Sequence, residues 1–397
     1  MIRRRREQRL DLGGLRTGGA NAACHISYNA ALMKRPAAMS AVGSTTAVVI
    51  PILAVIMLGL AWGRALTDGF VAIIGVLFAV CVPIAVHHAR AIAQRVCGPF
   101  GSLVLAVAST VLLAAPIMAM MMGRAGGAET LARDAVFGVV IIACNGILGL
   151  SLLVAARRTP NVCFDADGPG AALATVATFS ALTLVLPSFV RRIPGLQFSL
   201  SQIAFMAVTA LVLYGLFIAL QAPQSRDYYL AATPTGDSGA VATVQTRLPA
   251  IASVLLLLLA LVAAVGSAML VLPTIGGAVV AAGLPAASLG AAIALLILLP
   301  EAIAAVRAAR GNRVQASLNI AFGSLMASIG LTIPTIAIAS IWLPVPLRLA
   351  LAPSHIVLLA LTLIVTMLTV LSKRATLPQS GVHLALLVAY AFVSINA

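Results

Sequence analysis

The chain has 397 residues, of which 61% are hydrophobic and only 9% are charged, and its mean hydropathy is +1.10. Soluble globular domains typically carry about 25% charged residues. This composition excludes a soluble globular protein and predicts an all-α protein that crosses a membrane many times.

Stretches of about 20 apolar residues, long enough to cross the hydrocarbon core as a helix, recur along the chain. They predict eleven membrane spans: 45–63, 69–88, 100–122, 135–156, 170–190, 201–221, 249–272, 286–306, 315–342, 353–372 and 380–396. The span at 315–342 is long enough to be kinked or tilted. Pro334 supplies a cause, because proline interrupts the hydrogen-bond pattern of a helix.

The basic residues are unevenly distributed between the two sides of the predicted membrane. If the N-terminus is cytoplasmic, 19 of the 25 lysines and arginines fall on the cytoplasmic side and six on the other. Such a bias orients membrane proteins, so the net charge of +15 requires no nucleic-acid partner. We expect a multi-pass protein of the plasma (inner) membrane, with its C-terminus outside because eleven is an odd number of spans.

Two hydrophilic regions interrupt this pattern. The region 1–44 is polar and rich in arginine, and it lacks the apolar stretch of a signal peptide. We therefore expect a basic cytoplasmic tail, for which Met33 and Met39 are alternative start positions. The region 222–247 contains Pro, Gly, Ser and Asp and predicts a cytoplasmic linker.

The linker separates two sets of five spans, 69–221 and 248–397, while the first span, 45–68, stands apart. The two sets end in similar motifs, Leu213-Tyr214-Gly215-Leu216-Phe217 and Ala389-Tyr390-Ala391-Phe392. Because five is odd, successive sets must have opposite orientations in the membrane. This is the inverted-repeat plan of secondary transporters, in which the substrate site lies near the midplane between the repeats.

Glu301 is the acidic residue that this reading places deep inside an apolar span. A carboxylate there costs about 2.5–3.5 kcal/mol on insertion scales, and such residues usually line an ion or proton path. Pro300 has no N–H, so the carbonyl of Leu296 loses its helical partner and becomes available to a cation or proton. The alternative is that Glu301 is a protonated, hydrogen-bonded packing residue.

Small polar residues accompany Glu301 in the predicted helices. Asn145 and Ser324 lie in the third span of each set, and Ser109 and Thr110 lie in the second span of the first set. They supply either neutral oxygen ligands or close helix packing. The sequence shows no Ser/His/Asp set, metal-ligand cluster or phosphate loop, so we do not expect an enzyme.

Specific motifs surround these residues. Pro300-Glu301 is followed by Asn312-Arg313-Val314-Gln315, Ser317-Leu318-Asn319, Phe322-Gly323-Ser324 and Gly330-Leu331-Thr332-Ile333-Pro334. The rest of the chain contains His88-Ala89, Pro99-Phe100-Gly101-Ser102-Leu103, Leu131-Ala132-Arg133-Asp134 and His383-Leu384-Ala385-Leu386. From about residue 45 onward, the chain resembles the ChaA-type cation/proton antiporters of the calcium/cation antiporter superfamily.

The resemblance implies a cation site to which each alpha-repeat contributes one acidic residue. Glu301 is the acid of the second repeat, whereas the corresponding position of the first repeat is Leu113. Arg90 stands where the family often has an acidic or polar residue, and Gly98 stands where it has a glutamate. The first repeat therefore keeps the motifs of the family but lacks its acidic residues.

This loss bears on the transported ion. Calcium prefers about six to eight oxygen ligands, commonly including several carboxylates. One carboxylate with neutral oxygens from Ser109, Thr110, Asn145 and Ser324 suits sodium, potassium or a proton, and a cation and a proton would then compete for Glu301. His383 is a candidate proton relay, with a packed histidine as the alternative.

Two hypotheses follow for function. The first is a secondary active antiporter that exchanges calcium, sodium or potassium for protons by alternating access, with Glu301 binding the metal ion and the proton in turn. Its partners would be inorganic cations, protons and the lipid bilayer, with no cofactor beyond the transported ions; the sequence sets no oligomeric state. The second is a transport-inactive membrane scaffold or regulator, which Leu113 favours and the intact block 300–334 opposes.

The charge distribution makes a testable prediction about topology. A reporter that is active only outside the membrane should be active when fused after Ala397 and inactive when inserted in 222–247, because these positions lie on opposite sides. A reporter that is active only in the cytoplasm should give the reverse pattern. A cytoplasmic Ala397 would mean that the number of spans is even.

Overall fold

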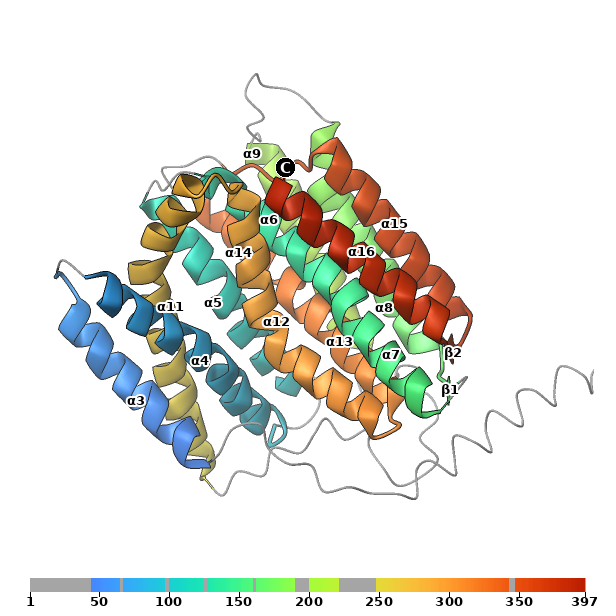
Figure 1. Ribbon diagram of the computed structural model, residues 1–397, viewed down its shortest axis with the longest axis horizontal. Coiled ribbons are helices and arrows are strands. Elements are labelled where there is room, and N and C mark those ends of the chain that lie inside the picture. Colours follow the sequence, from blue (N-terminus) through green and yellow to red (C-terminus); the bar gives the residue numbers. More distant parts are fainter. Residues whose placement is uncertain are drawn as a thin grey trace, which may run out of the picture.

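The computed structural model describes residues 44–64, 67–96, 100–123, 127–159, 162–189, 200–220, 248–342 and 347–396. The predicted tail at 1–44, apart from Ser44, and the predicted linker at 222–247 lie outside the described residues. The described chain forms a bundle of helices (Figure 1). One small antiparallel sheet, β1 (Val162–Cys163) with β2 (Arg374–Ala375), lies at its edge.

Ten helices in the described part of the chain are long and apolar enough to cross a membrane, and a shorter apolar helix covers Thr45–Ala61. A helix rises about 1.5 Å per residue, so roughly 20 residues cross the hydrocarbon core. The prediction of an all-α polytopic membrane protein with about eleven spans is therefore confirmed.

After the first helix, α3 (Ser44–Ala61), the helices form two sets of five units. The first set comprises α4 (Asp68–Ala93), α5 (Phe100–Met122), α6 (Ala128–Ile141) continued by η1 (Ile142–Ile147) and α7 (Leu148–Arg158), α8 (Asp167–Ser180) continued by η2 (Ala181–Val185) and η3 (Leu186–Ser188), and α9 (Leu200–Leu220). The second set comprises α11 (Ala250–Ala281), α12 (Ala286–Arg310), α13 (Val314–Gly330) continued by α14 (Thr332–Ala339), α15 (Pro353–Leu371) and α16 (Leu377–Asn396).

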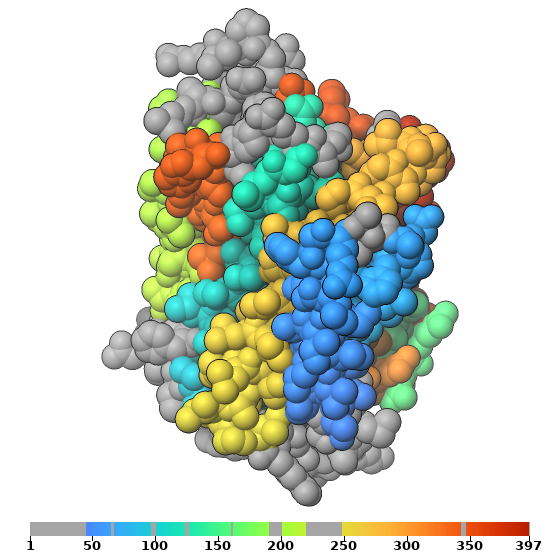
Figure 2. Space-filling view, turned by 90° about the vertical axis from the view of Figure 1, so that its left-hand side faces the viewer, coloured from blue at the N-terminus to red at the C-terminus, as the bar shows by residue number. Residues whose placement is uncertain are grey.

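The two sets pack against each other reciprocally. Their first helices, α4 and α11, share the most extensive helix contact among the described elements. The second helix of each set packs against the third unit of the other, α5 against α13 and α12 against α6 and α7. The extra helix α3 lies against α4 and α11, as blue beside yellow in Figure 2. This order agrees with two five-helix repeats, although the domain boundaries themselves stay a prediction.

The third unit of each set is interrupted. In the first set, η1 is a π-helical turn that contains Asn145 and Gly146, and such turns inside α-helices are frequent at functional sites. In the second set, α13 ends at Gly330 and α14 begins at Thr332. The long predicted span is therefore interrupted at Leu331, and Pro334, which lacks the N–H that would bond the carbonyl of Gly330, is consistent with the predicted cause.

Arginines tie the helices together at the end of the bundle where α4, α7 and α12 finish, which we call the basic end. There the guanidinium of Arg95 donates to the carbonyl of Leu248 at 2.6 Å, and that of Arg158 donates to the carbonyl of Arg310 at 2.7 Å. A cation near the last carbonyls of a helix is stabilising, as for Arg158 at the end of α12. The basic end corresponds to the face that the charge distribution predicts to be cytoplasmic.

Glycines allow the two sets to approach closely. An ideal Cβ on Gly290 of α12 would lie 2.7 Å from the Cβ of Asp134 and 2.9 Å from the backbone nitrogen of Ala135. On Gly138 of α6, the added atom would lie 2.7 Å from the hydroxyl of Tyr390. Small residues at helix contacts are typical of membrane bundles, because they bring the backbones near each other.

The contact of α6 with α12 yields a prediction for stability. Gly290→Ala should destabilise the protein by roughly 1–3 kcal/mol, because the added methyl group meets a backbone atom that cannot rotate away. Gly277→Ala is the matched control, since Gly277 has open space around its Cβ position. It should be neutral or slightly stabilising, because alanine favours the helix. Thermal unfolding of the purified protein in detergent measures both, and equal midpoints would contradict the close packing.

Candidate ion-binding site

Glu301 lies on α12, with its side chain only 3% exposed. It stands nine residues before Arg310, which places it about 14 Å along the helix axis from the basic end. Pro300 lies inside α12 without ending the helix. Its missing N–H leaves the carbonyl of Leu296 without a partner from within the helix, next to the carboxylate.

Arg90 is the cation paired with this carboxylate. Its Nη2 atom donates to Oε1 of Glu301 at 3.2 Å, and its side chain is 15% exposed. The predicted span ended at residue 88 and left Arg90 in a loop. This boundary was wrong, because α4 continues to Ala93 and places Arg90 in its last turn. The signal in the sequence was a basic residue where the resembling family has acidic or polar ones.

The second oxygen of Glu301, Oε2, is buried and has no hydrogen-bond partner among the described residues. A buried polar atom without a partner costs free energy that a bound proton or cation would recover. Oε1 of Glu301 is therefore paired with the guanidinium of Arg90, while Oε2 is available to a proton or a cation. This geometry fits an exchangeable site better than a fully hydrogen-bonded packing residue.

The hydroxyl groups predicted to surround Glu301 are buried on neighbouring helices. Ser324 lies on α13, while Ser109 and Thr110 lie on α5, and both of these helices pack against α12. Within the described ranges, no hydrogen bond joins any of the three to Glu301, and the hydroxyl of Thr110 has no partner there. Their role as ion ligands stays a prediction.

Asn145 belongs to a different polar group. Its Nδ2 donates to the hydroxyl of Thr362 at 2.9 Å, and its Oδ1 faces Nδ1 of His383 at 3.0 Å. The other ring nitrogen of His383 lies 3.1 Å from the hydroxyl of Thr369. Asn145 thus connects η1 to α15 and α16. Among the described residues, no hydrogen bond joins it to Glu301, although η1 packs against α12, and its role as an ion ligand stays a prediction.

All four side chains of this group are buried. If Oδ1 of Asn145 accepts, Nδ1 of His383 carries the proton and Nε2 accepts from Thr369, so the ring is neutral with both nitrogens satisfied. Saturated polar networks rigidify a structure. This hydrogen bonding is what we expect if His383 is a packed histidine. The role of His383 as a proton relay stays a prediction.

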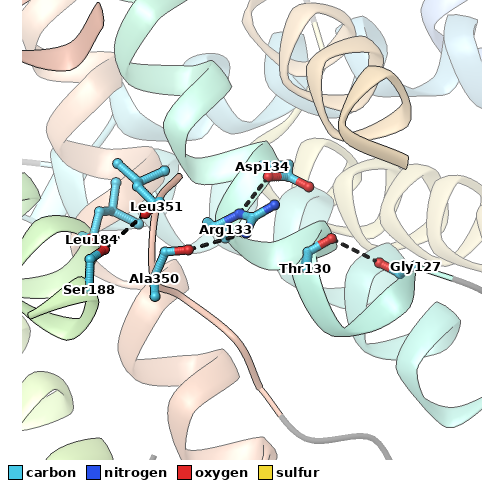
Figure 3. Close-up of polar contacts among 8 residues, drawn as sticks. All are labelled: Gly127, Thr130, Arg133, Asp134, Leu184, Ser188, Ala350 and Leu351. Carbon is cyan, nitrogen blue, oxygen red and sulfur yellow. Dashed lines mark hydrogen bonds and ion pairs between the residues drawn. The ribbon is translucent and has the colours of Figure 1, made fainter. Parts of the chain in front are cut away.

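Asp134 is a second buried carboxylate, which corrects the prediction that Glu301 alone lies inside a span. The guanidinium of Arg133 donates to Oδ1 of Asp134 at 2.7 Å and to the carbonyl of Ala350 at 3.1 Å (Figure 3). The predicted span began at residue 135, whereas the helix begins at Ala128 and carries Asp134 two turns inside. The contact of Asp134 with Gly290 places it about 16 Å along α12 from Glu301.

Leu113 is fully buried on α5 and belongs to the main hydrophobic core. It lies three residues after Thr110, so both side chains point to the same side of the helix. The first repeat therefore presents a hydroxyl and an apolar side chain where the resembling family would present an acid. Its charged contribution to the site is the base Arg90.

Comparisons with known proteins agree with this architecture. The family described as sodium/calcium exchanger protein matches residues 66–222 and 252–396. The protein y4hA of Sinorhizobium fredii is 40% identical over 313 residues, which is 78% of this chain and 84% of that protein. The sodium-potassium/proton antiporter ChaA of Escherichia coli is 28% identical over 356 residues, which is 87% of this chain and 94% of that protein.

Two solved structures share the fold. Native YfkE has a TM-score of 0.65 at 15% identity and covers 89% of this chain and 100% of its own. The H+/Ca2+ exchanger CAX has a TM-score of 0.65 at 17% identity and covers 88% of this chain and 87% of its own. The resemblance predicted from the sequence motifs is confirmed.

Proposed function

Because this chain belongs to the sodium/calcium exchanger protein family, we propose that it exchanges a monovalent cation, sodium or potassium, for a proton at Glu301. Membership makes it a membrane transporter and not an enzyme, as the sequence predicted. The observation that carries the proposal is that Glu301 is a buried carboxylate inside a membrane helix, with one oxygen paired and the other unpaired. Asp134 shares this pattern of one paired and one unpaired oxygen, and Glu301 is preferred because it stands in the Pro300-Glu301 motif on which the family resemblance rests.

The exchange follows from competition for one carboxylate. Ionised Glu301 binds either a cation or a proton, and each bound form is neutral and can remain in a low-dielectric interior. Alternating access would then expose the site to one side of the membrane at a time. The interruption at Leu331, between α13 and α14, breaks the helix at membrane depth next to α12, so we assign the movement to it.

Charge favours a monovalent ion. A divalent ion at Glu301 would carry one uncompensated positive charge, and Arg90 would add to it. Calcium sites usually supply several carboxylates, whereas Leu113 supplies none. ChaA, a relative at 28% identity, is named as a sodium-potassium/proton antiporter, which supports the same choice.

We assign the basic end to the cytoplasm and the C-terminus to the outside of a bacterial inner membrane. The support is the predicted bias of basic residues and the position of Arg95, Arg158 and Arg310 at one end of the bundle. Arg90 then lies between Glu301 and the cytoplasmic solution, and Asp134 lies toward the outside.

A transport-inactive scaffold is the second candidate, and one observation favours it. The ion pair with Arg90 is the only one that Glu301 forms among the described residues, and it neutralises the carboxylate from within the protein. A protein that never released Arg90 would keep the fold of an exchanger and carry no ions. The two functions differ in whether Glu301 is needed for ion movement.

Glu301→Gln should reduce cation/proton exchange to the background of vesicles without the transporter, because an amide keeps the shape of the side chain but cannot cycle its charge. The measurement is cation-induced proton release from everted vesicles, with sodium, potassium and calcium tested separately. Glu129→Gln is the control, since Glu129 forms a part-exposed salt bridge with Arg348 far from α12's basic end. Native exchange by Glu301→Gln at equal membrane abundance would favour the scaffold.

Leu113→Glu should shift the preference toward calcium. Two nearby carboxylates raise each other's proton affinity, and a bound divalent ion relieves the repulsion. The measurement is the ratio of calcium-induced to sodium-induced proton release, with Leu112→Glu as a control for an acid at a neighbouring buried position. An unchanged ratio in a stably inserted Leu113→Glu protein would show that Leu113 does not face the site.

A further inference from the structure

Arg90 pairs with the carboxylate to which the proposed cation would bind. We propose that Arg90 is a tethered substitute for the transported cation, pairing with Glu301 whenever neither a cation nor a proton is bound. This inference rests on the proposed function, because it assigns a role to Arg90 at the same site. It adds a third occupant of the carboxylate, and with it a step that a strict exchanger lacks.

The geometry allows Arg90 to occupy the site and to leave it. Its Nη2 is 3.2 Å from Oε1 of Glu301, so the two charges are in direct contact. Glu301 is almost fully buried, whereas the arginine side chain is partly exposed and starts in the last turn of α4. Arginine has a long apolar stem and can extend its charged head to water at a membrane surface. Released from Glu301, the guanidinium would therefore turn toward the basic end.

Arg90 and a transported cation would compete for the same carboxylate. Both need its negative charge, and two positive charges beside one carboxylate repel each other. A cation from solution must therefore displace the guanidinium, which lowers the apparent affinity for that cation. Removing the arginine's charge should raise this affinity, whereas a merely structural arginine would not affect it in this direction.

The charge of the unloaded site has a consequence for coupling. A strict exchanger returns only with its second substrate bound, because an unpaired carboxylate is costly in the membrane interior. Paired with Arg90, the carboxylate is neutral without any ion from solution. The site then has three neutral forms, with a cation, with a proton or with Arg90. The third permits the transporter to return empty and to move cations without counter-transport.

The experiment uses the full chain in liposomes and sodium-22 as the probe. The same well-buffered pH is set on both sides, and an inward thiocyanate gradient makes the interior negative. One-for-one sodium/proton exchange moves no net charge and does not respond to this potential. Uncoupled sodium movement carries charge, so the native protein should take up sodium-22 faster with the gradient than without it. A parallel assay with a pH gradient and no thiocyanate measures exchange.

Arg90→Gln separates the two modes. It should lower the ratio of potential-driven to pH-driven uptake at least about fivefold, and reach half-saturation at a roughly tenfold lower sodium concentration. Arg90→Lys keeps the charge on a shorter side chain and should give an intermediate half-saturation. Arg158→Gln is the matched control, since it removes an exposed arginine at the same end that binds the carbonyl of Arg310. It should behave as the native protein does.

Several results would overturn the inference. Native uptake that ignores the potential, an unchanged ratio of potential-driven to pH-driven uptake in Arg90→Gln, or a half-saturation that stays the same or rises would each do so. Loss of pH-driven exchange in a correctly inserted Arg90→Gln would also do so, because Arg90 would then be required for exchange itself. If the native protein moves no sodium, potassium or calcium in either assay, the proposed function fails. If the native protein shows exchange that requires Glu301 but no potential-driven sodium uptake, only this inference fails and the proposed function stands.

Discussion

The structure is organised around one electrostatic constraint, a carboxylate held inside an apolar helix. An ionised Glu301 in that position must be neutralised, and the described fold neutralises it with the guanidinium of Arg90. The pair joins residues 211 positions apart, from the first helix of one set and the second helix of the other. It exists because α4 packs against both α11 and α12. The reciprocal contact of the two sets is thus also what completes the site.

The buried polar groups of the interior differ in how completely they are hydrogen-bonded. The group of Asn145, His383, Thr362 and Thr369 is closed by hydrogen bonds on every side chain and fixes η1 against α15 and α16. Such a network resists change. Glu301 instead keeps one buried oxygen without a partner among the described residues, which is the condition for binding something further. Movement and binding are therefore expected at Glu301, within a frame that the Asn145 group holds rigid.

The two repeats contribute opposite charges to the site. In the family that the chain resembles, each repeat supplies an acid, whereas here the second repeat supplies Glu301 and the first supplies Arg90 and the apolar Leu113. Exchanging an acid for a base changes the net charge of the empty site from negative to zero. That change alone disfavours the binding of a divalent ion. It also makes Arg90 a competitor of a monovalent cation for the carboxylate of Glu301. The scaffold and antiporter hypotheses differ only in whether Arg90 ever leaves.

Hydropathy, the arrangement of basic residues and the motifs after Pro300 determined the membrane class, the approximate number of spans and the family, and they marked Glu301 as the candidate site residue. These features are local: apolar runs of sufficient length must be helices in a bilayer, and a proline removes one backbone N–H wherever its helix is placed. Helix ends were less certain, because polar residues at a boundary are compatible with helix or loop. Arg90 and Asp134 were both missed for this reason, each lying within two residues of a predicted end.

Only the tertiary structure decided which polar residues belong together. Asn145 and Glu301 both stand in apolar spans and looked equivalent in the sequence, yet Asn145 pairs with His383 and Glu301 with Arg90. These partners are 238 and 211 residues away, and no local pattern encodes such distances. The pairing depends on the rotation and depth of each helix, which are set by close contacts such as that of Gly290 with Asp134. Sequence showed which side chains needed a partner in the membrane, and helix packing chose the partner.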